Sequence, residues 1–340
     1  MYLWENRNIV FEERLFAENQ FVREKIIYEY SQNKIISDII HIAYNINEAF
    51  FMQLGVSITS ILENNKNKNI AIHVFVDEYK QKDLKKIKET AKKYKANIYI
   101  YLMDMRPFEE FHIKTKRFSR VTYLRLIMPK ILKNITDKFL YMDADMICDG
   151  DISVFQNIDL QNKPLAAVSD AQDAVEYRTK FLKMKSGKYF NDGIMWINIR
   201  NWEKESVTER AFSYQGADPK RFLGQSQDIL NMVLDGNIVF IDRKYNQTAG
   251  ENITEDTLIY HFVGRCKPWN VVVFKRDRLW RYYLEISLWD NIVGEIPPKT
   301  CEHYYDYKYI AEVERERKNY IKMLQFYFWY AVLKISKFIQ

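Results

Sequence analysis

The sequence predicts an α/β fold in which a mostly parallel central sheet carries helices on both faces. From residue 38 onward, short apolar runs of strand length alternate with longer runs whose apolar residues recur at helical spacing. The chain has 340 residues, 47% of them hydrophobic, which is enough to bury the core of one large domain. We therefore expect a helical extension over 1–37, the sheet domain over 38–275 and a helical region over 276–340.

The first elements of the sheet domain follow one another regularly. Apolar runs predict strands at 38–44, 70–77 and 98–104. A helix is expected at 55–65, where the run ends in asparagine. Apolar residues recur at helical spacing among lysines over 84–94, which predicts an amphipathic crossover helix between the second and third strands.

The same alternation continues in the second half of the domain. A segment that is closed by Pro129 leads to an apolar strand at 139–142. Further strands are expected at 165–170 and 193–199, a helix with a polar first turn at 224–236, and a strand running into a loop at 257–269. Strands that alternate with helices favour parallel pairing.

Two carboxylates, Asp143 and Asp145, follow the strand at 139–142. In open α/β sheets the carboxyl ends of the strands form the crevice where ligands bind. Two carboxylates that leave one strand can converge on a hard cation such as Mg²⁺ or Mn²⁺, which would hold a phosphate. The alternative is ordinary turn chemistry, since aspartates after a strand often cap nearby backbone amides.

A phosphate would need such a cation here, because the chain lacks the glycine-rich loops that cradle phosphates. It has only 10 glycines and neither a G-x-G-x-x-G nor a P-loop motif. His261 begins the run HFVGRCKPW. An isolated strand histidine is most often a packed core residue, but an imidazole followed by Gly264 and Lys267 also suits a metal and a phosphate.

Composition limits the possible partners. Lys and Arg exceed Asp and Glu by 51 − 45 = 6, and the pI near 8.8 suits an anionic substrate or surface. The excess is too diffuse to indicate nucleic acid. Three cysteines without C-x-x-C spacing favour a reducing compartment. We expect no signal peptide and no spanning helix, and hence a protein that is soluble or lies on a membrane.

Four motifs, taken in order, resemble glycosyltransferase family 8, and specifically the bacterial lipopolysaccharide core glucosyl- and galactosyltransferases that use UDP-sugars. They are IAYNINEAFFMQLGVSITSILENN, YMDADMICDGDIS, FNDGIMWINIRNW with SQDILN, and HFVGRCKPW. The similarity covers nearly the whole chain and is weakest at its start. It implies a single Rossmann-like nucleotide-sugar-binding domain of the GT-A type.

The resemblance also assigns roles to individual residues. Asp143, Asp145 and His261 match the family's three ligands to Mn²⁺ (or Mg²⁺), which bridges the donor diphosphate. The expected contacts to the UDP-sugar, from uridine to diphosphate and sugar, are Ala43, Asn47, Arg125, Asp143, Ala144, Asp145, Asn191, Gly264 and Lys267. The expected catalytic residues, near the reacting anomeric carbon, are Asp192, Gln227 and Asp228.

Two positions depart from the family pattern. Asn47 stands where relatives carry an aspartate that meets the nucleotide, and it can still donate and accept hydrogen bonds. Ser226 stands where the D-Q-D motif begins with an aspartate that hydrogen-bonds the donor sugar. A charged acceptor binds a hydroxyl more strongly than a neutral one does. We therefore expect a weaker grip on a plain hexose, or room for a larger substituent.

The implied activity is a retaining transfer of glucose or galactose from a UDP-sugar, in α-linkage, to a lipopolysaccharide core, a lipid-linked oligosaccharide or another glycan acceptor. Negative charge that develops on the leaving oxygen would be stabilised by the divalent ion. The amide of Gln227 is a poor nucleophile, which favours front-face attack. Two alternatives stay open: a haloacid-dehalogenase-type phosphatase, and a non-catalytic sugar-nucleotide-binding module.

The end of the chain differs in composition from the rest. After the prolines at 297 and 298, residues 315–340 contain six Lys or Arg against Glu316 alone, a net charge of 6 − 1 = +5. Their centre, MLQFYFWYAVL, is too short to cross a bilayer but can lie among headgroups. We expect a cytoplasmic protein that is peripheral on the anionic inner face of a bacterial cytoplasmic membrane. A terminal helix packed on the sheet domain is the alternative.

Overall fold

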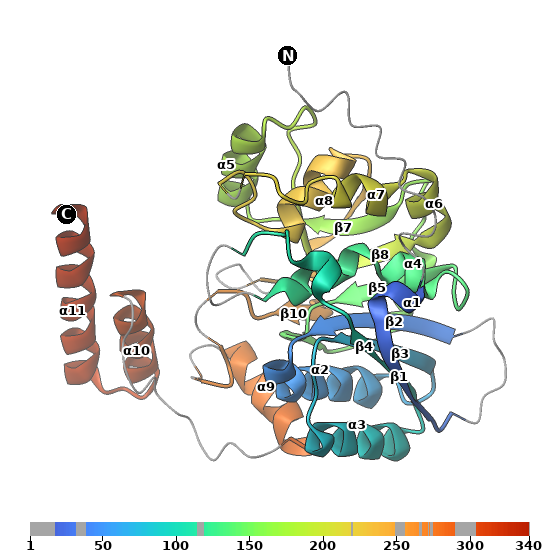
Figure 1. Cartoon of the computed structure of the whole chain (residues 1–340). Helices are drawn as coiled ribbons and strands as arrows, with labels where there is room; N and C mark the ends of the chain where they lie inside the picture. The colour runs from blue at the N-terminus through green and yellow to red at the C-terminus, as the bar shows by residue number, and fades with distance from the viewer. Residues whose placement is uncertain are drawn as a thin grey trace.

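The protein is built around one central sheet, which Figure 1 shows with helices on either side and a separate pair of helices beside it. This arrangement confirms the predicted α/β class. The computed structural model describes residues 18–31, 39–113, 119–218, 220–248, 256–264, 267–270, 272, 275–289 and 304–339.

Eight strands form the central sheet, and most of them run in the same direction. In spatial order they are β1 (Val22–Glu29), β4 (Asn97–Met103), β3 (Asn69–Val76), β2 (Ile39–Ile46), β5 (Lys138–Met142), β8 (Phe190–Asn198), β7 (Leu165–Ser169) and β9 (Val239–Ile241). Parallel pairing joins β4, β3, β2 and β5, and also β7 and β9. Only β1 and β8 run against these strands. A second, two-stranded sheet pairs β6 (Met146–Cys148) with β10 (Ile259–His261).

Helices cover both faces of the sheet and so bury its central strands completely. One face carries α2 (Phe51–Asn64), α3 (Gln81–Tyr94) and α9 (Lys275–Ile286). The other carries the 3-10 helix η5 (Arg120–Leu126) with α4 (Met128–Leu132), α6 (Ile199–Lys204), α7 (Val207–Phe212) and α8 (Ser226–Leu234). Successive strand residues therefore enter different cores: Ile42 packs on the α2 side and Ala43 on the α8 side.

The remaining short elements lie in the connections. They are α1 (Glu18–Phe21), η3 (Glu48–Phe50), η4 (Arg106–Phe108), η6 (Ile152–Asn157), α5 (Gln172–Leu182) and η7 (Arg243–Tyr245). The strands and helices predicted within 38–269 are confirmed, with ends that shift. The sequence did not predict β6, β9 or α5–α7, which are short or have weak periodicity.

The prediction of a helical extension over 1–37 is wrong for residues 22–29, which form the edge strand β1. This segment pairs antiparallel with β4, so that Ile26 lies opposite Ile100. Tertiary pairing at a free sheet edge overrides a local pattern that carries many charges. Residues 1–17 and 32–37 of the predicted extension, and the predicted break at 297 and 298, lie outside the described residues.

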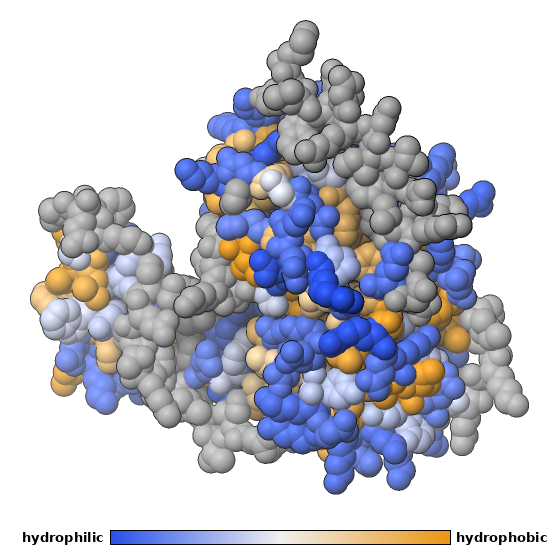
Figure 2. Space-filling view, in the orientation of Figure 1, coloured by the Kyte–Doolittle hydropathy of each residue, from blue (hydrophilic) through white to orange (hydrophobic). Residues whose placement is uncertain are grey.

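The C-terminal helices α10 (Tyr304–Glu316) and α11 (Tyr320–Ile339) pack against each other and stand apart from the sheet (Figure 1). Aromatic rings pack between the two helices; for example, the ring centroids of Tyr307 and Phe326 are 6.4 Å apart. Along α11 the large apolar side chains that stay exposed include Ile321, Leu324, Phe328, Val332 and Ile335. Figure 2 shows apolar patches on this helix pair. Within the described part of the chain, no helix combines the length and apolarity needed to cross a bilayer.

By contrast, α9 and residues 287–289 belong to the main body, beyond the predicted boundary at 275. Trp280 and Trp289 are buried in the α2-side core. Trp289 lies directly against Gly55 of α2, where an added Cβ would stand only 2.2 Å from its ring. The absence of a side chain at residue 55 is what lets Trp289 dock.

We predict that Gly55→Ala destabilises the protein, although alanine is more favourable than glycine in a helix by about 1 kcal/mol. Overpacking against the Trp289 ring should cost about 1–3 kcal/mol, and thermal unfolding should show the lower melting temperature. In a Trp289→Ala background the same change should be neutral or stabilising, because the obstacle is gone. An unchanged melting temperature for Gly55→Ala in the wild-type background would contradict this packing.

Candidate functional site

The candidate site forms where β5 ends and a second strand pair begins. Asp143 and Asp145 occupy the turn between β5 and β6. Because β6 pairs antiparallel with β10, His261 lies opposite Met146. The backbone N–H of Phe262 donates to the carbonyl of Asp145 at 3.0 Å. Backbone pairing thus places the imidazole beside both carboxylates, although His261 is far from them in sequence.

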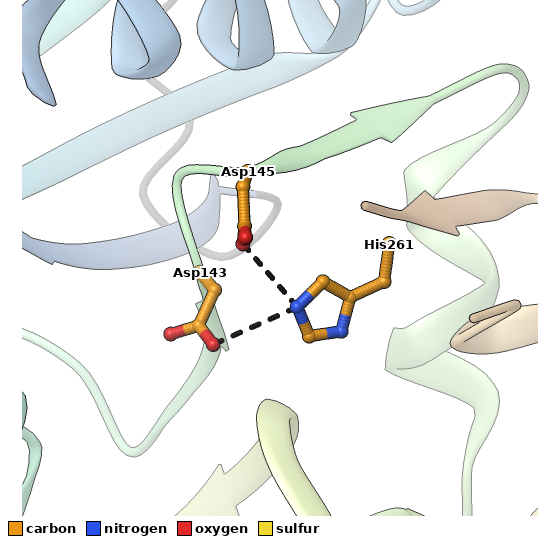
Figure 3. Close-up of side chains that lie close together, drawn as sticks. All are labelled: Asp143, Asp145 and His261. Carbon is orange, nitrogen blue, oxygen red and sulfur yellow. Dashed lines mark ion pairs between the residues drawn. The ribbon is translucent and has the colours of Figure 1, made fainter. Parts of the chain in front are cut away.

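The three side chains converge on one point, as Figure 3 shows. His261 Nε2 lies 3.2 Å from Asp145 Oδ1 and 3.9 Å from Asp143 Oδ2. One ligand atom from each residue lies within 4.8 Å of the others, and no other group of this kind occurs among the described residues. Two carboxylates and an imidazole form a donor set that suits Mn²⁺ and other divalent ions. The cluster could therefore hold a metal.

Asn246 orients the imidazole from the side opposite the carboxylates. Its Oδ1 lies 2.9 Å from His261 Nδ1, and its Nδ2 donates to Asn191 Oδ1 at 2.9 Å. An amide oxygen can only accept, so Nδ1 carries the proton and Nε2 keeps its lone pair facing the aspartates. Outer hydrogen bonds of this type fix the tautomer of metal-binding histidines. Sequence reasoning missed Asn246, which no local pattern singles out.

Gly193 leaves the space into which His261 fits. A Cβ at this residue would stand 2.5 Å from His261 Cε1 and 2.9 Å from Asn191 Oδ1. The carbonyl of Gly193 also accepts from the backbone N–H of Asp143 at 2.8 Å. The glycine of the F-N-D-G segment thus brings β8 close to both the histidine and the first aspartate.

Two cations balance the carboxylates of the site. Lys267 Nζ lies 2.6 Å from Asp145 Oδ2 and also donates to the carbonyl of Phe262. Burial opposes ionisation of Asp145, but the charge of Lys267 holds its pKa well below the usual range. Lys267, the predicted phosphate-binding cation, therefore lies next to a candidate metal ligand.

Arg125 is the second cation, and it bridges two carboxylates. Its Nη2 lies 3.0 Å from Asp143 Oδ1, and its Nη1 lies 2.6 Å from Asp192 Oδ2. The buried guanidinium also stacks 4.5 Å from the ring of Tyr141, whose hydroxyl donates to Asp143 Oδ1. Burial raises the pKa of Asp192 to about 6, against the opposing effect of Arg125.

Gln227 and Asp228, both predicted near the reacting carbon, differ in their surroundings. The amide of Gln227 donates to Asp170 Oδ2 at 2.8 Å, and its Oε1 accepts from the N–H of Asp192 at 3.2 Å. Asp228 is fully buried, where it accepts from the hydroxyl of Tyr189 and pairs with Arg178. Because its oxygens are sealed in the interior, Asp228 suits a role in positioning α8 and not direct contact with a substrate.

The other predicted donor contacts lie around the same strand ends. Ala43 is fully buried within β2, and Ala144 is buried between the two aspartates. Asn47 follows β2 and caps η3, where its Oδ1 accepts from the N–H of Ala49 at 3.1 Å. Gly264 has φ +88, a conformation that favours glycine, and an added Cβ there would meet open space.

A sequence model of glycosyl transferase family 8 matches residues 41–272, more than half of the chain. The chain belongs to glycosyl transferase family 8. The match covers the sheet from β2 onward, the Asp143–Asp145–His261 cluster and the start of the loop after β10, and it leaves out the edge strand β1. The resemblance inferred from the four motifs is thereby confirmed.

Curated members of the family align with this chain over most of its length. The lipopolysaccharide 1,3-galactosyltransferase of Salmonella typhimurium is 29% identical over 344 residues, covering 95% of this chain and 99% of that protein. The lipopolysaccharide 1,2-glucosyltransferase of Escherichia coli K12 is 29% identical over 291 residues, covering 81% and 86%.

Solved structures show the same fold. The galactosyltransferase LgtC in complex with donor and acceptor sugar analogs superposes with a TM-score of 0.66 at 19% identity, covering 75% of this chain and 98% of that one. The fold of this family 8 protein is thus the predicted GT-A type. Neither the phosphatase nor the non-catalytic alternative finds support in these comparisons.

We predict that Asn246→Ala weakens Mn²⁺ binding by about 10–100-fold, because the imidazole loses the hydrogen bond that fixes its tautomer. Mn²⁺ titrations followed by electron paramagnetic resonance, with and without UDP, would measure this change. Asn246→Asp, which keeps an acceptor for Nδ1–H, is the matched control and should retain most of the affinity. Equal Mn²⁺ affinity in the wild type and in Asn246→Ala would remove this residue from the site.

Proposed function

We propose that this protein is a retaining hexosyltransferase that moves glucose or galactose from a UDP-sugar, in α-linkage, to a lipopolysaccharide core or a related glycan. The observation that carries the proposal is the Asp143–Asp145–His261 cluster at the strand ends of a family 8 fold. Relatives that align over most of this chain bear the names of lipopolysaccharide galactosyl- and glucosyltransferases, which supports the substrate class.

The arrangement of charges suits the departure of UDP. A divalent ion held by Asp143, Asp145 and His261 would act as a Lewis acid on the diphosphate. Lys267, which contacts Asp145, adds a further positive charge at the position where leaving-group charge develops. The open space that a Cβ at Gly264 would meet leaves room for close approach of the nucleotide.

The side chains near the sugar favour front-face attack. Gln227 offers only a weakly basic amide, and Asp228 is sealed in the interior. Asp192 is held in an ion pair with Arg125, and it accepts from Ser226, both of which reduce its nucleophilicity. The acceptor's proton then passes to the departing phosphate oxygen while the new bond forms on the same face of the sugar.

The C-terminal helix pair supports a peripheral membrane location, on the inner face of a bacterial cytoplasmic membrane. Residues 315–340 carry a net charge of 6 − 1 = +5. The exposed apolar residues of α11 recur at intervals of three and four, so they form one stripe along the helix. An apolar stripe flanked by lysines suits an anionic bilayer surface, where a lipid-linked acceptor would also reside.

Transfer requires the intact cluster, according to the proposal. Asp143→Ala, Asp145→Ala and His261→Ala should each lower kcat/KM about 1,000-fold or more, equivalent to ~4 kcal/mol of transition-state stabilisation. The measurement is Mn²⁺-dependent transfer or hydrolysis across a panel of UDP-sugars. The control is Asp151→Ala in the following loop, where a half-exposed aspartate caps η6 and pairs with Lys68, away from the cluster.

Near-normal turnover in any cluster variant would remove that residue from the metal site. Phosphate release from a simple phosphomonoester, without UDP formation, would instead favour the phosphatase.

Membrane attachment is predicted to depend on the α11 stripe. Leu324→Glu combined with Phe328→Glu should weaken binding to anionic phosphatidylglycerol vesicles about tenfold or more, since burying each side chain contributes about 1.5–3 kcal/mol. Vesicle sedimentation gives the affinity, and hydrolysis of UDP-sugar in solution should not change. Ile135→Glu, at an exposed position of the main body, is the control. Unchanged vesicle binding in the double variant would overturn this assignment.

A further inference from the structure

Ser226 and Asp192 form a buried pair that joins α8 to β8. The hydroxyl of Ser226 donates to Asp192 Oδ2 at 2.9 Å and lies 3.0 Å from the hydroxyl of Thr122. Ser226 is 2% exposed and Asp192 7% exposed. Ser226 is the position that departs from the D-Q-D pattern and Asp192 lies in the F-N-D-G segment, and the structure brings the two side chains into contact.

The Asp192 carboxylate is fixed through one oxygen only. Oδ2 receives both Ser226 and Arg125, whose Nη1 lies 2.6 Å away. Arg125 Nη1 also donates to the backbone carbonyl of Asp192 at 2.8 Å. Among the described residues, no donor contacts Oδ1. This oxygen is not one of the fully buried atoms that lack a partner, so it stays accessible and offers an acceptor to a donor group from a ligand.

The neighbours of Asp192 indicate which part of a ligand would reach it. On one side, Arg125 connects it to Asp143 of the candidate metal cluster. On the other, its backbone N–H donates to Gln227, whose amide reaches Asp170. A nucleotide-sugar with its diphosphate at the cluster would place its hexose next to this point. The groups that a hexose presents there are hydroxyls, which donate to carboxylates.

We propose that Asp192 is a specificity-determining residue for the donor sugar, whose Oδ1 accepts a hydrogen bond from a ring hydroxyl while Ser226 holds Oδ2. The carboxylate that the resemblance places at position 226 is thus supplied from position 192. The site then binds an unsubstituted hexose tightly, contrary to the weaker binding expected from Ser226 alone. This inference rests on the proposed function.

An exchange of the two residues tests the pair. Asp192→Ser should lower kcat/KM for the preferred UDP-hexose by ~10–100-fold, because a charged acceptor is lost. Ser226→Asp should also lower it, since two carboxylates then crowd one place. The double variant, Asp192→Ser with Ser226→Asp, should recover to within ~10-fold of the wild type, because one carboxylate and one hydroxyl again face each other.

Two further measurements separate this inference from the proposed function. Calorimetric binding of UDP with Mn²⁺ should be equal in all four proteins, because UDP carries no hexose. For the wild type, removing one particular hydroxyl from the donor hexose should lower kcat/KM. For Asp192→Ser, the same deoxy donor and the complete donor should react with equal kcat/KM. Should Asp192→Ser not fold, Asp192→Asn keeps the shape and should show the same loss of kcat/KM with UDP binding intact.

The outcomes are distinct. If the wild type binds no UDP and transfers no sugar, the proposed function fails. If the wild type transfers hexose but the double variant has a kcat/KM as low as the single variants, the inference that position 192 supplies the carboxylate expected at position 226 is overturned. If Asp192→Ser loses affinity for UDP, the role of Asp192 is to hold Arg125 in place. That result would overturn the proposed contact between Asp192 and the sugar.

Discussion

The candidate site depends on a three-residue ladder between β6 and β10. This ladder sets His261 opposite Met146 and carries Phe262 to the carbonyl of Asp145. Without it, the imidazole would have no fixed relation to a turn that lies more than a hundred residues earlier in the chain. Short strands contribute little stability alone, so the ladder relies on its surroundings. Ile147 and Ile259 anchor it in the α2-side core. The position of the site therefore depends on how α2, α3 and α9 pack against the sheet.

Charge balance is the second constraint on the site. Three carboxylates, those of Asp143, Asp145 and Asp192, face Arg125 and Lys267, which leaves a formal charge of 2 − 3 = −1 with the histidine left aside. Each carboxylate has a cationic partner within hydrogen-bond distance. Breaking a buried pair by removing one partner is far more costly than replacing both. The site is therefore organised before any ligand arrives, and its residual negative charge favours a cation.

The sequence predicted what is local and missed what depends on distant contacts. Asp143 and Asp145 follow an apolar strand, so composition and spacing alone indicate a ligand-binding sheet edge. His261 could be joined to them only through resemblance, because nothing local in its strand indicates where β10 pairs. Asn246 and the Ser226–Asp192 contact gave no local signal, since each joins segments far apart in the chain. The strand β1 was mistaken for helix because its identity is set by β4 and not by its own pattern.

The strand β1 also affects whether one molecule can pair, strand to strand, with another in a crowded solution. A parallel sheet that ended on β4 would present an open row of backbone donors and acceptors to other chains. Instead β1 closes this side and turns Arg23, Glu24, Lys25 and Glu29 toward solvent. The opposite margin ends on β9, which has only three residues. Charged and very short margins resist strand-to-strand polymerisation, so the protein is protected against aggregation at both edges of its sheet.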